Sequence, residues 1–403
     1  MTSTPARTTQ TSTQTTQTSD AALARAIEPA GADEFADDYW EQQPLHVARG
    51  EAGRFDDLLS AEDAERLITE PGLRHPAFRL VKADTRLDVR DYTVDVGWRP
   101  VPFSGTADVG RVSAEFENGA TIVLQGLHLN WLPLARYCSE LERSLGQPAQ
   151  ANAYLTPRRS QGLPVHHDTH DVFVLQVSGS KRWLVYEPAF ELPLKHQRYR
   201  PEHGEPGPAV LDVVLGSGDT LYLPRGWLHE ALTSDEDSLH LTIGINVYTW
   251  VDAVRSGLER CEEDVAFRHA AEGDAPAELL ERLAAELSDE RVGAARRQRF
   301  RESRRPVLDG QLSELRALDR LGPETVVVRR ATAVADLEEG NGTVALLLAR
   351  KRVVFPPYVR ATLERLCEGE AVTVAALPGD LDEAGRLVLV RRLVREGFLR
   401  IVS

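Results

Sequence analysis

The chain has 403 residues, of which 42% are hydrophobic and 27% charged, and its formal net charge is -15. This length is too great for one ordinary domain and predicts two or three, and the composition is that of a globular protein. So acidic a chain is a poor general binder of nucleic acid, because neutralisation of phosphates by cationic side chains supplies most of that affinity. The acidity suits a basic partner such as a cationic protein, although solubility alone also explains it.

Neither membrane insertion nor secretion is indicated. No run of about 18 apolar residues occurs, and the N-terminal stretch, rich in Thr, Ser and Gln, lacks the apolar segment of a secretory signal. The three cysteines, Cys138, Cys261 and Cys367, are scattered and odd in number. This pattern argues against a disulfide framework and for a reducing compartment, so we expect a cytoplasmic protein.

Residues 1–19 form a low-complexity tail that is too poor in apolar side chains to order itself. Residues 20–250 begin with helix signals, including Phe35 and Tyr39 one helical turn apart, with Pro44 ending that helix. From about residue 76 they continue as short β-rich runs separated by Gly, Pro and Asp. Strands at this spacing predict an antiparallel sandwich or barrel.

Two hairpins are predicted within this β-rich part. Residues 172–177 and 181–186 have strand character and flank Gly179, in a tight connection of the two-residue hairpin type. Residues 211–215 and 220–223 flank a Gly-Ser-Gly-Asp turn in the same way. Each pair of runs is therefore expected to form neighbouring strands.

The remainder of the chain divides into a helical segment and a small unit. Residues 251–310 are dominated by Ala, Glu, Arg and Leu, with leucines at helical spacing. Residues 311–403 contain two strand-like runs, two helices and a terminal strand, a succession typical of a winged-helix-like module. Asp380, Asp382 and Glu383 open the second long helix and would repel phosphate. A protein-contact or structural role is therefore expected rather than DNA binding.

His166, Asp168 and His229 are the candidate metal ligands. A strand alternates its faces, so His166 and Asp168 point the same way and His167 points the opposite way. His229 comes from a distant strand, after a Gly-Asp turn and a Pro-Arg-Gly segment that reverse the chain. Two imidazoles and one carboxylate hold one face of an octahedral ion and leave the other open, as in non-haem Fe(II) oxygenases.

The two parts of this pattern differ in specificity. An H-x-D sequence alone is a weak indication, because a structural histidine is the commoner explanation. Its combination with G-D-x-L-Y-x-P-x-G-x-x-H is much stronger. The sequence therefore predicts an iron site that activates dioxygen.

Such an oxygenase needs an electron donor, and the commonest donor for this ligand set is 2-oxoglutarate. Its distal carboxylate requires a cation or hydroxyl groups inside the barrel. Lys181 begins a predicted strand and can serve as a buried point charge for that carboxylate. A lysine at a hairpin corner that points to solvent explains the position equally well.

These segments resemble the JmjC-type, cupin-fold ribosomal oxygenases, a branch of the Fe(II)/2-oxoglutarate oxygenases that hydroxylate protein side chains. The matching text includes F-A-D-D-Y-W-E-Q-Q-P-L at residues 35–45, N-A-Y-L-T-P at 152–157, H-H-D at 166–168, K-R-W at 181–183, G-D-T-L-Y-L-P-R-G-W-L-H at 218–229 and S-L-H-L-T at 238–242. The resemblance covers residues 20–250 well. In the later part of the chain it is architectural and less specific.

The resemblance implies a fold class and a site. The fold is α+β, with a double-stranded β-helix (the cupin/JmjC jelly roll), then a helical dimerisation segment and a winged-helix-like C-terminal domain. His166, Asp168 and His229 would bind Fe(II), and Lys181 would bind the distal carboxylate of 2-oxoglutarate.

The same resemblance extends to the pocket around the iron. Asn152 and Tyr154 would line it near the co-substrate and the target residue, and His240 would lie on the strand beside the iron. One departure concerns Gly244, which stands near a position where some relatives carry a serine that helps to anchor 2-oxoglutarate.

Three functions fit the sequence. The first is hydroxylation of a ribosomal protein by a homodimeric enzyme, on arginine as in bacterial relatives or on histidine as in eukaryotic ones. The second keeps the chemistry but acts on a biosynthetic peptide or small metabolite. The third is a non-catalytic, metal-binding cupin whose terminal module contacts partners. Failure to consume 2-oxoglutarate in the presence of iron would favour the third.

Overall fold

The computed structural model describes residues 21–70, 72–97, 101–200, 202, 206–271, 273, 276–304, 306–340 and 342–402. The chain divides into two compact units, Met1–Asn246 and Val247–Ser403. The tail predicted over residues 1–19 lies outside the described residues. None of the helices in the described ranges has the length and apolar character needed to span a membrane.

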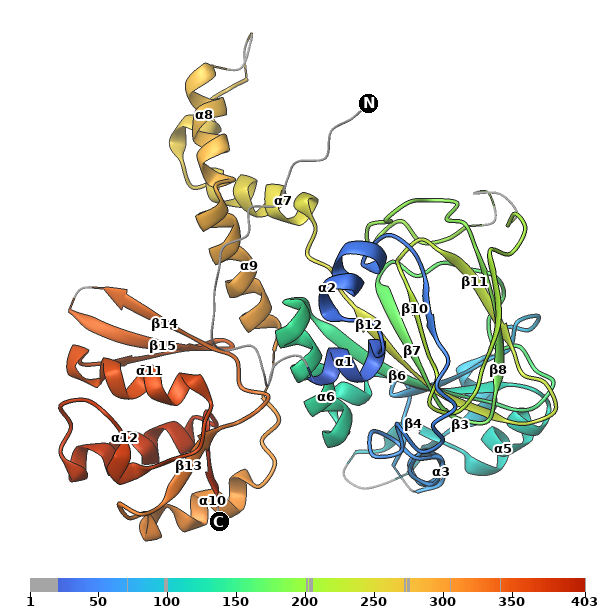
Figure 1. Cartoon of the computed structure of the whole chain (residues 1–403), viewed down its shortest axis with the longest axis horizontal. Helices are drawn as coiled ribbons and strands as arrows, with labels where there is room; N and C mark the ends of the chain where they lie inside the picture. Colours follow the sequence, from blue (N-terminus) through green and yellow to red (C-terminus); the bar gives the residue numbers. More distant parts are fainter. Residues whose placement is uncertain are drawn as a thin grey trace. The chain divides into compact units, whose positions relative to one another are not determined.

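The first unit is built on two antiparallel sheets (Figure 1). The large sheet has the order β1-β10-β7-β12-β6-β5-β2, and the small sheet has the order β11-β8-β9. The strands of the large sheet are β1 (Leu45–Val47), β2 (Phe78–Val81), β5 (Thr121–Leu124), β6 (Ala149–Thr156), β7 (Asp171–Ser178), β10 (Thr220–Leu223) and β12 (Ser238–Ile245). Those of the small sheet are β8 (Lys181–Tyr186), β9 (Leu211–Leu215) and β11 (Leu228–Leu232).

The two sheets pack face to face through one apolar core. It is formed by side chains that alternate along strands of both sheets, namely Val172, Val174, Leu221 and Leu223 from the large sheet and Trp183, Val185 and Leu215 from the small one. This arrangement is consistent with the expected JmjC/cupin jelly roll. The sheets also enclose the space into which the candidate ligands project.

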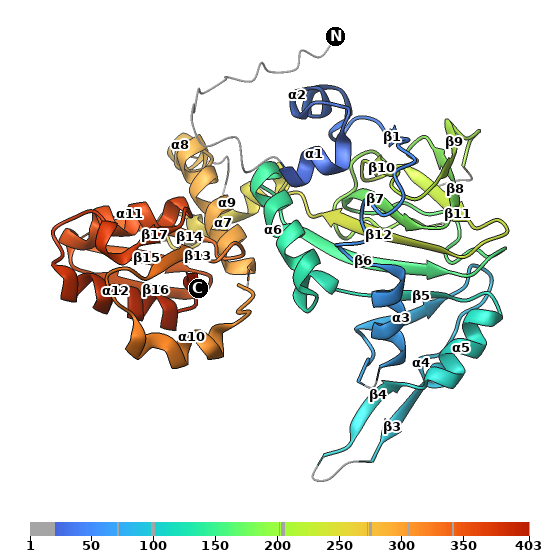
Figure 2. The same ribbon diagram turned by 60° about the horizontal axis from the view of Figure 1, so that its bottom comes forward.

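Strand β6 shows how one strand serves two faces. Its buried residues include Ala151 and Ala153, which alternate along the strand with the half-buried Asn152 and Tyr154. Helix α6 (Leu132–Leu145) covers the outer side of the sheet beside β6, and α1 (Ala21–Ile27) packs on α6 (Figure 2). The inner side of β6 is thereby left to line the interior of the barrel.

The two predicted hairpins are wrong. β7 pairs with β10 and β12 rather than with β8, and β8 pairs with β9 and β11. Gly179 is the corner at which the chain leaves the large sheet for the small one. Its φ is +63°, and a Cβ there would lie 1.9 Å from the carbonyl oxygen of Asp237. Residues 216–219 make the return crossing from β9 to β10.

The other elements of the first unit cover and extend the barrel. They are α2 (Ala32–Glu34), the π-helix η1 (Phe35–Tyr39), α3 (Ala61–Thr69), α4 (Val89–Tyr92), β3 (Thr93–Val96), β4 (Phe103–Ala107), α5 (Val109–Glu117) and the 3-10 turn η2 (Leu127–Leu129). Strands β3 and β4 form a two-stranded arm that projects from the barrel (Figure 2). The helix predicted around Phe35 and Tyr39 is thus present, in the wider π form.

The second unit begins with three helices, α7 (Trp250–Cys261), α8 (Ala277–Glu286) and α9 (Asp289–Ser303). The Nε of Arg260 on α7 donates to the Glu286 carboxylate on α8 at 2.6 Å. The later elements are α10 (Gln311–Ala317), β13 (Val326–Arg329), β14 (Ala335–Gly340), β15 (Thr343–Leu348), β16 (Lys351–Phe355), α11 (Arg360–Glu368), β17 (Val372–Thr373), α12 (Glu383–Arg395) and β18 (Leu399–Val402), with short 3-10 turns η4 (Val265–Arg268), η5 (Leu318–Arg320), η6 (Pro357–Val359) and η7 (Val374–Ala376).

These later elements form two three-stranded sheets, β17-β13-β18 and β14-β15-β16, and share one apolar core with α11 and α12. The predicted strands near 325–328 and 344–348 and both predicted helices are present. The winged-helix-like class of this part, and its separation from the helical segment near residue 310, remain predictions.

Candidate metal centre

His166 and His229 are brought together by a backbone bridge. The His166 N–H donates to the His229 carbonyl at 3.1 Å, and the His229 N–H donates to the His166 carbonyl at 2.8 Å. Such a mutual pair places both side chains on the same side, and the two ring centroids lie 4.5 Å apart. His229 belongs to β11, whereas His166 forms only this isolated bridge. The regular strand predicted around residues 166–168 is therefore absent.

Each imidazole is oriented by its own backbone. Nδ1 of His166 lies 2.8 Å from the carbonyl oxygen of Pro164, and Nδ1 of His229 lies 3.0 Å from that of Trp227. A carbonyl can only accept, so each Nδ1 carries the proton and each Nε2 keeps its lone pair. This tautomer is the one that a metal ligand requires.

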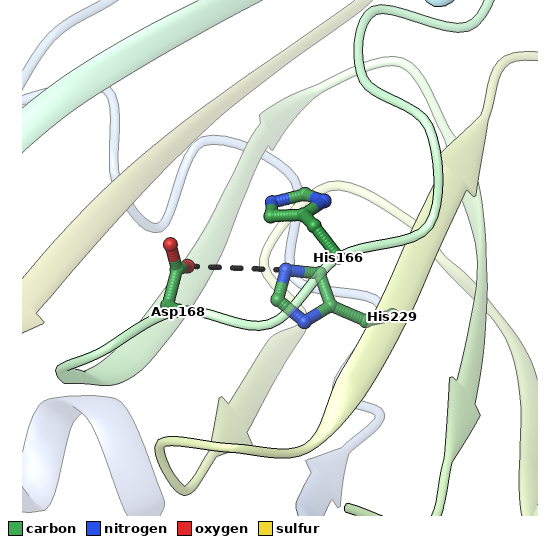
Figure 3. A group of neighbouring side chains, drawn as sticks. All are labelled: His166, Asp168 and His229. Atoms are coloured by element: carbon green, nitrogen blue, oxygen red, sulfur yellow. Dashed lines mark ion pairs between the residues drawn. The ribbon is translucent and has the colours of Figure 1, made fainter. Parts of the chain in front are cut away.

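Asp168 completes the group. Its Oδ2 lies 3.8 Å from Nε2 of His229, and one donor atom from each of the three residues lies within 4.8 Å of the others. Figure 3 shows the three side chains turned toward one another. Among the described residues this is the group that could hold an ion through two imidazoles and a carboxylate. His167, predicted to point the other way, has its Nε2 3.1 Å from the carbonyl oxygen of Gln197.

The protonation states also suit a divalent cation. Burial lowers the pKa of His229 to about 4, so its imidazole is neutral at neutral pH. Burial alone would raise the pKa of the Asp168 carboxyl, but the imidazoles of His170 and His166 outweigh it and the pKa is lowered. The Asp168 carboxyl group is therefore ionised at neutral pH.

The three residues open into a cavity of about 250 Å³ between the sheets. Its lining also contains the predicted residues Tyr154, Lys181 and His240. Asn152 is not part of that lining, and its Oδ1 instead accepts the backbone N–H of Gly126 at 2.9 Å. The structure thus gathers three of the four predicted co-substrate residues around the candidate metal centre.

Lys181 is buried, with only 4% of its surface exposed. Its Nζ donates to Oγ1 of Thr156 at 2.8 Å, and Oγ1 of Thr121 donates to the same oxygen at 3.1 Å. Burial lowers the pKa of Lys181 to about 7. The ammonium and two hydroxyl groups form a compact polar end to the cavity, so the solvent-facing alternative for Lys181 is wrong.

Tyr154 and His240 form a stacked pair on the cavity wall. Their ring centroids are 5.0 Å apart and their planes differ by 2°. Burial holds the pKa of His240 well below its usual range, with a further lowering from the Lys181 charge. Burial and the Asp168 charge raise the pKa of Tyr154 to about 12, against the opposing effect of Arg79. Both rings are therefore uncharged at neutral pH.

Several cavity residues were not predicted. Arg79, Thr121, Trp183 and Glu230 line the same space, and Thr156 lies behind Lys181. The period of two along β6 could have added Thr156 to Asn152 and Tyr154. Glu230 directly follows His229, and Trp183 lies two residues beyond Lys181 on the same strand. Arg79 and Thr121 come from β2 and β5, which the sequence does not connect to the metal motif.

Gly244 occupies a tight position on β12. A Cβ at this residue would lie 3.1 Å from Nε2 of Gln150 and 3.2 Å from Cε1 of His170. A serine could therefore be accommodated here only if those two side chains moved by a few tenths of an ångström. The side chains of Gln150 and His170 occupy the space that a serine side chain at this position would take.

Comparisons with known proteins show what this site is similar to. Residues 127–253 match the family model described as "JmjC domain". The chain is 35% identical over 222 residues to the "bifunctional lysine-specific demethylase and histidyl-hydroxylase NO66" of Drosophila persimilis, covering 55% of this chain and 31% of that protein. It is 33% identical over 251 residues to "ribosomal oxygenase 1" of Gallus gallus, covering 60% and 40%.

A solved structure shares the fold over nearly the whole chain. It is the Escherichia coli ribosomal oxygenase YcfD in complex with cobalt and 2-oxoglutarate, with a TM-score of 0.55 and 17% identity, covering 93% of this chain and 99% of that one. Residues 127–253 are thus similar to a JmjC domain, and the resemblance of the chain to the JmjC-type ribosomal oxygenases is confirmed. The chain spans less than half the length of these two curated relatives.

The bridge geometry predicts which histidine binds metal. Loss of a residue that hydrogen-bonds to a metal ligand typically weakens metal binding by roughly 10- to 100-fold. His166→Ala removes a ligand itself and should therefore weaken Co(II) binding by more than this. His167→Ala removes the neighbouring imidazole, which points elsewhere, and should leave the affinity close to that of the unaltered chain. Titration of the metal-free protein with Co(II), followed by visible absorbance, measures both. Equal losses in the two variants would contradict the assignment.

Proposed function

We propose that this chain is an Fe(II)- and 2-oxoglutarate-dependent oxygenase that hydroxylates an arginine or histidine side chain of a protein, with a ribosomal protein as its substrate. The observation that carries the proposal is the convergence of His166, Asp168 and His229 in the lining of a cavity that also has Lys181 in its wall. The named relatives and the cobalt and 2-oxoglutarate bound to YcfD support the same chemistry.

The donor set fits Fe(II). Two neutral imidazole nitrogens and one carboxylate oxygen would hold one face of the ion and leave the other for small ligands. When bound, the iron would supply, with 2-oxoglutarate and O2, the oxidising capacity to insert one oxygen atom into a C–H bond. The second oxygen atom leaves in succinate, and CO2 is released.

The cavity residues would divide the remaining work. Lys181, backed by the hydroxyl group of Thr156, would bind the distal carboxylate of 2-oxoglutarate. The stacked rings of Tyr154 and His240 would form one wall of the co-substrate site and keep water from it. Asn152, beyond that wall, remains a predicted contact for the target residue. Holding the target C–H bond close to the metal is the main contribution that such a rigid cavity makes.

We also propose that the helical segment mediates a homodimer. Helix α7 exposes Trp250, Val254 and Leu258, which follow one another at helical spacing on one face, together with Val251 beside them. A second copy of this chain would cover such a face. Cytoplasmic location remains the expectation from the three cysteines, all of which are thiols, and neither membrane nor nucleic-acid binding forms part of the proposal.

Mass mapping of ribosomal peptides tests the substrate. In the native host, one peptide should gain the mass of a single oxygen atom when the gene is present, and it should lose this gain when His166 is replaced by Ala. Absence of any gene-dependent oxygen on ribosomal peptides would overturn the substrate assignment. If the purified protein then still converts 2-oxoglutarate to succinate, a peptide or metabolite substrate takes its place.

The buried lysine predicts a pH dependence of co-substrate binding. Burial holds the pKa of Lys181 at about 7, below its unfolded value, and only the charged form attracts the distal carboxylate. The Kd for 2-oxoglutarate should therefore rise with pH above 7, approaching about tenfold per pH unit above roughly pH 8. Calorimetry on the Co(II)-loaded protein between pH 6.5 and 8.5 measures it. Lys181→Met should bind weakly with no such slope, and a flat profile in the unaltered chain would refute this role.

Sedimentation velocity tests the dimer. The unaltered chain should sediment as a dimer at micromolar concentration, and Val254→Glu combined with Leu258→Glu should give a monomer, because two charges would be buried in the interface. Co(II) binding by this variant should match that of the unaltered chain. A monomeric unaltered chain would contradict the proposed assembly.

A further inference from the structure

A buried cluster of charges adjoins the turn that leads to His229. Asp171, the first residue of β7, is fully buried, and the Arg225 side chain is 7% exposed. Nη1 of Arg225 donates to Oδ2 of Asp171 at 3.0 Å and also to the Glu41 carboxylate. Three distant segments of the chain therefore meet at one guanidinium group.

Tyr222 completes this cluster. Its hydroxyl group donates to Oδ1 of Asp171 at 2.9 Å and accepts the backbone N–H of Glu41 at 3.0 Å. Both carboxylate oxygens of Asp171 are thus engaged, one by Tyr222 and one by Arg225. Tyr222 is itself fully buried and packs against Phe35 of the π-helix, with ring centroids 4.9 Å apart. The N-terminal segment is thereby tied to the barrel at Glu41.

The cluster is connected to two metal ligands through the backbone. Arg225 lies in the turn that leads to His229, and the next residue, Gly226, donates its N–H to the Asp168 carbonyl at 3.1 Å. The φ of Gly226 is +94°, and a Cβ there would lie 2.4 Å from the carbonyl oxygen of Phe190. The turn therefore has no room to move toward Phe190. Its position is set on the other side by the contact of Arg225 with Asp171.

A buried ion pair is a weak device for stability, since desolvation of the two charges offsets their attraction and apolar replacements are often as stable. The effect of the ion pair on the geometry of the turn is stronger. Any other arrangement of the turn would leave a buried charge without its partner, and such arrangements are therefore unfavourable. We propose that Arg225, held between Asp171 and Glu41, is a positioning residue that sets the separation of Asp168 and His229 and so the fit of the metal ion. The inference rests on the metal centre of the proposed function.

Paired substitutions separate positioning from folding. Arg225→Met leaves Asp171 buried without its cation and should lower both stability and Co(II) affinity. Asp171→Asn combined with Arg225→Met removes both charges, and its urea unfolding midpoint should return close to that of the unaltered chain. Its Co(II) affinity should stay about 10- to 100-fold lower, with a changed visible spectrum, because the turn has lost its anchor.

Two further variants keep the test informative if the double variant folds poorly. Glu41→Gln removes one of the two carboxylates at Arg225 while keeping its volume, and it should weaken Co(II) binding at the lower end of that range with an unchanged unfolding midpoint. Arg66→Met breaks an exposed pair with Glu70 on α3 and should change neither quantity.

The outcomes are distinct. Recovery of both stability and Co(II) affinity in the double variant, with the original spectrum, would overturn the positioning role and leave the metal centre intact. Full Co(II) affinity in Glu41→Gln would count against the role in the same way. Failure of the unaltered chain to bind Co(II) would overturn the proposed metal centre and the positioning role together.

Discussion

The candidate site depends on one backbone contact, the mutual pair of hydrogen bonds between His166 and His229. It joins an irregular segment to strand β11 and brings two imidazoles to the same side. Each Nδ1 is then fixed by a carbonyl two residues earlier in the chain, so both Nε2 atoms are available to a metal. Asp168 lies two residues beyond His166, and this spacing alone brings its carboxylate close to the two Nε2 atoms. The backbone bridge, the two carbonyl contacts and the H-x-D spacing thus convert a sequence motif into a three-donor face.

The jelly roll supplies the cavity that adjoins this three-donor face. The chain crosses between the sheets at Gly179 and again at residues 216–219, and the two sheets bound a cavity that is lined by Lys181, Tyr154 and His240 together with the three candidate ligands. Burial makes the histidine and tyrosine neutral and brings the lysine pKa to about 7. A buried cationic side chain in the lining of the cavity suits a dianionic co-substrate. The buried charges around Arg225 have a related role in our proposal, since they hold the turn that positions Asp168 and His229.

The sequence predicted the ligands because their spacing is local. H-x-D needs only two residues of extended backbone to align, even where no regular strand forms, and the Gly-Asp to His229 motif is contiguous. Strand pairing was predicted wrongly because Gly179 marks a reversal without revealing its partner, which is set by β9 and β11 far along the chain. Thr121 and Arg225 were missed for the same reason. Their roles come from contacts with Thr156, Asp171 and Glu41 that no periodicity encodes.

The most direct test of the account is a crystal structure of the full chain with Co(II) and 2-oxoglutarate, solved with anomalous data at the cobalt edge. The account predicts one ion about 2.0–2.2 Å from Nε2 of His166, Nε2 of His229 and a carboxylate oxygen of Asp168, the usual range for such ligands. The distal carboxylate of 2-oxoglutarate should lie on Nζ of Lys181. An ion held by His167 or His170, or a co-substrate carboxylate that does not contact Lys181, would contradict it.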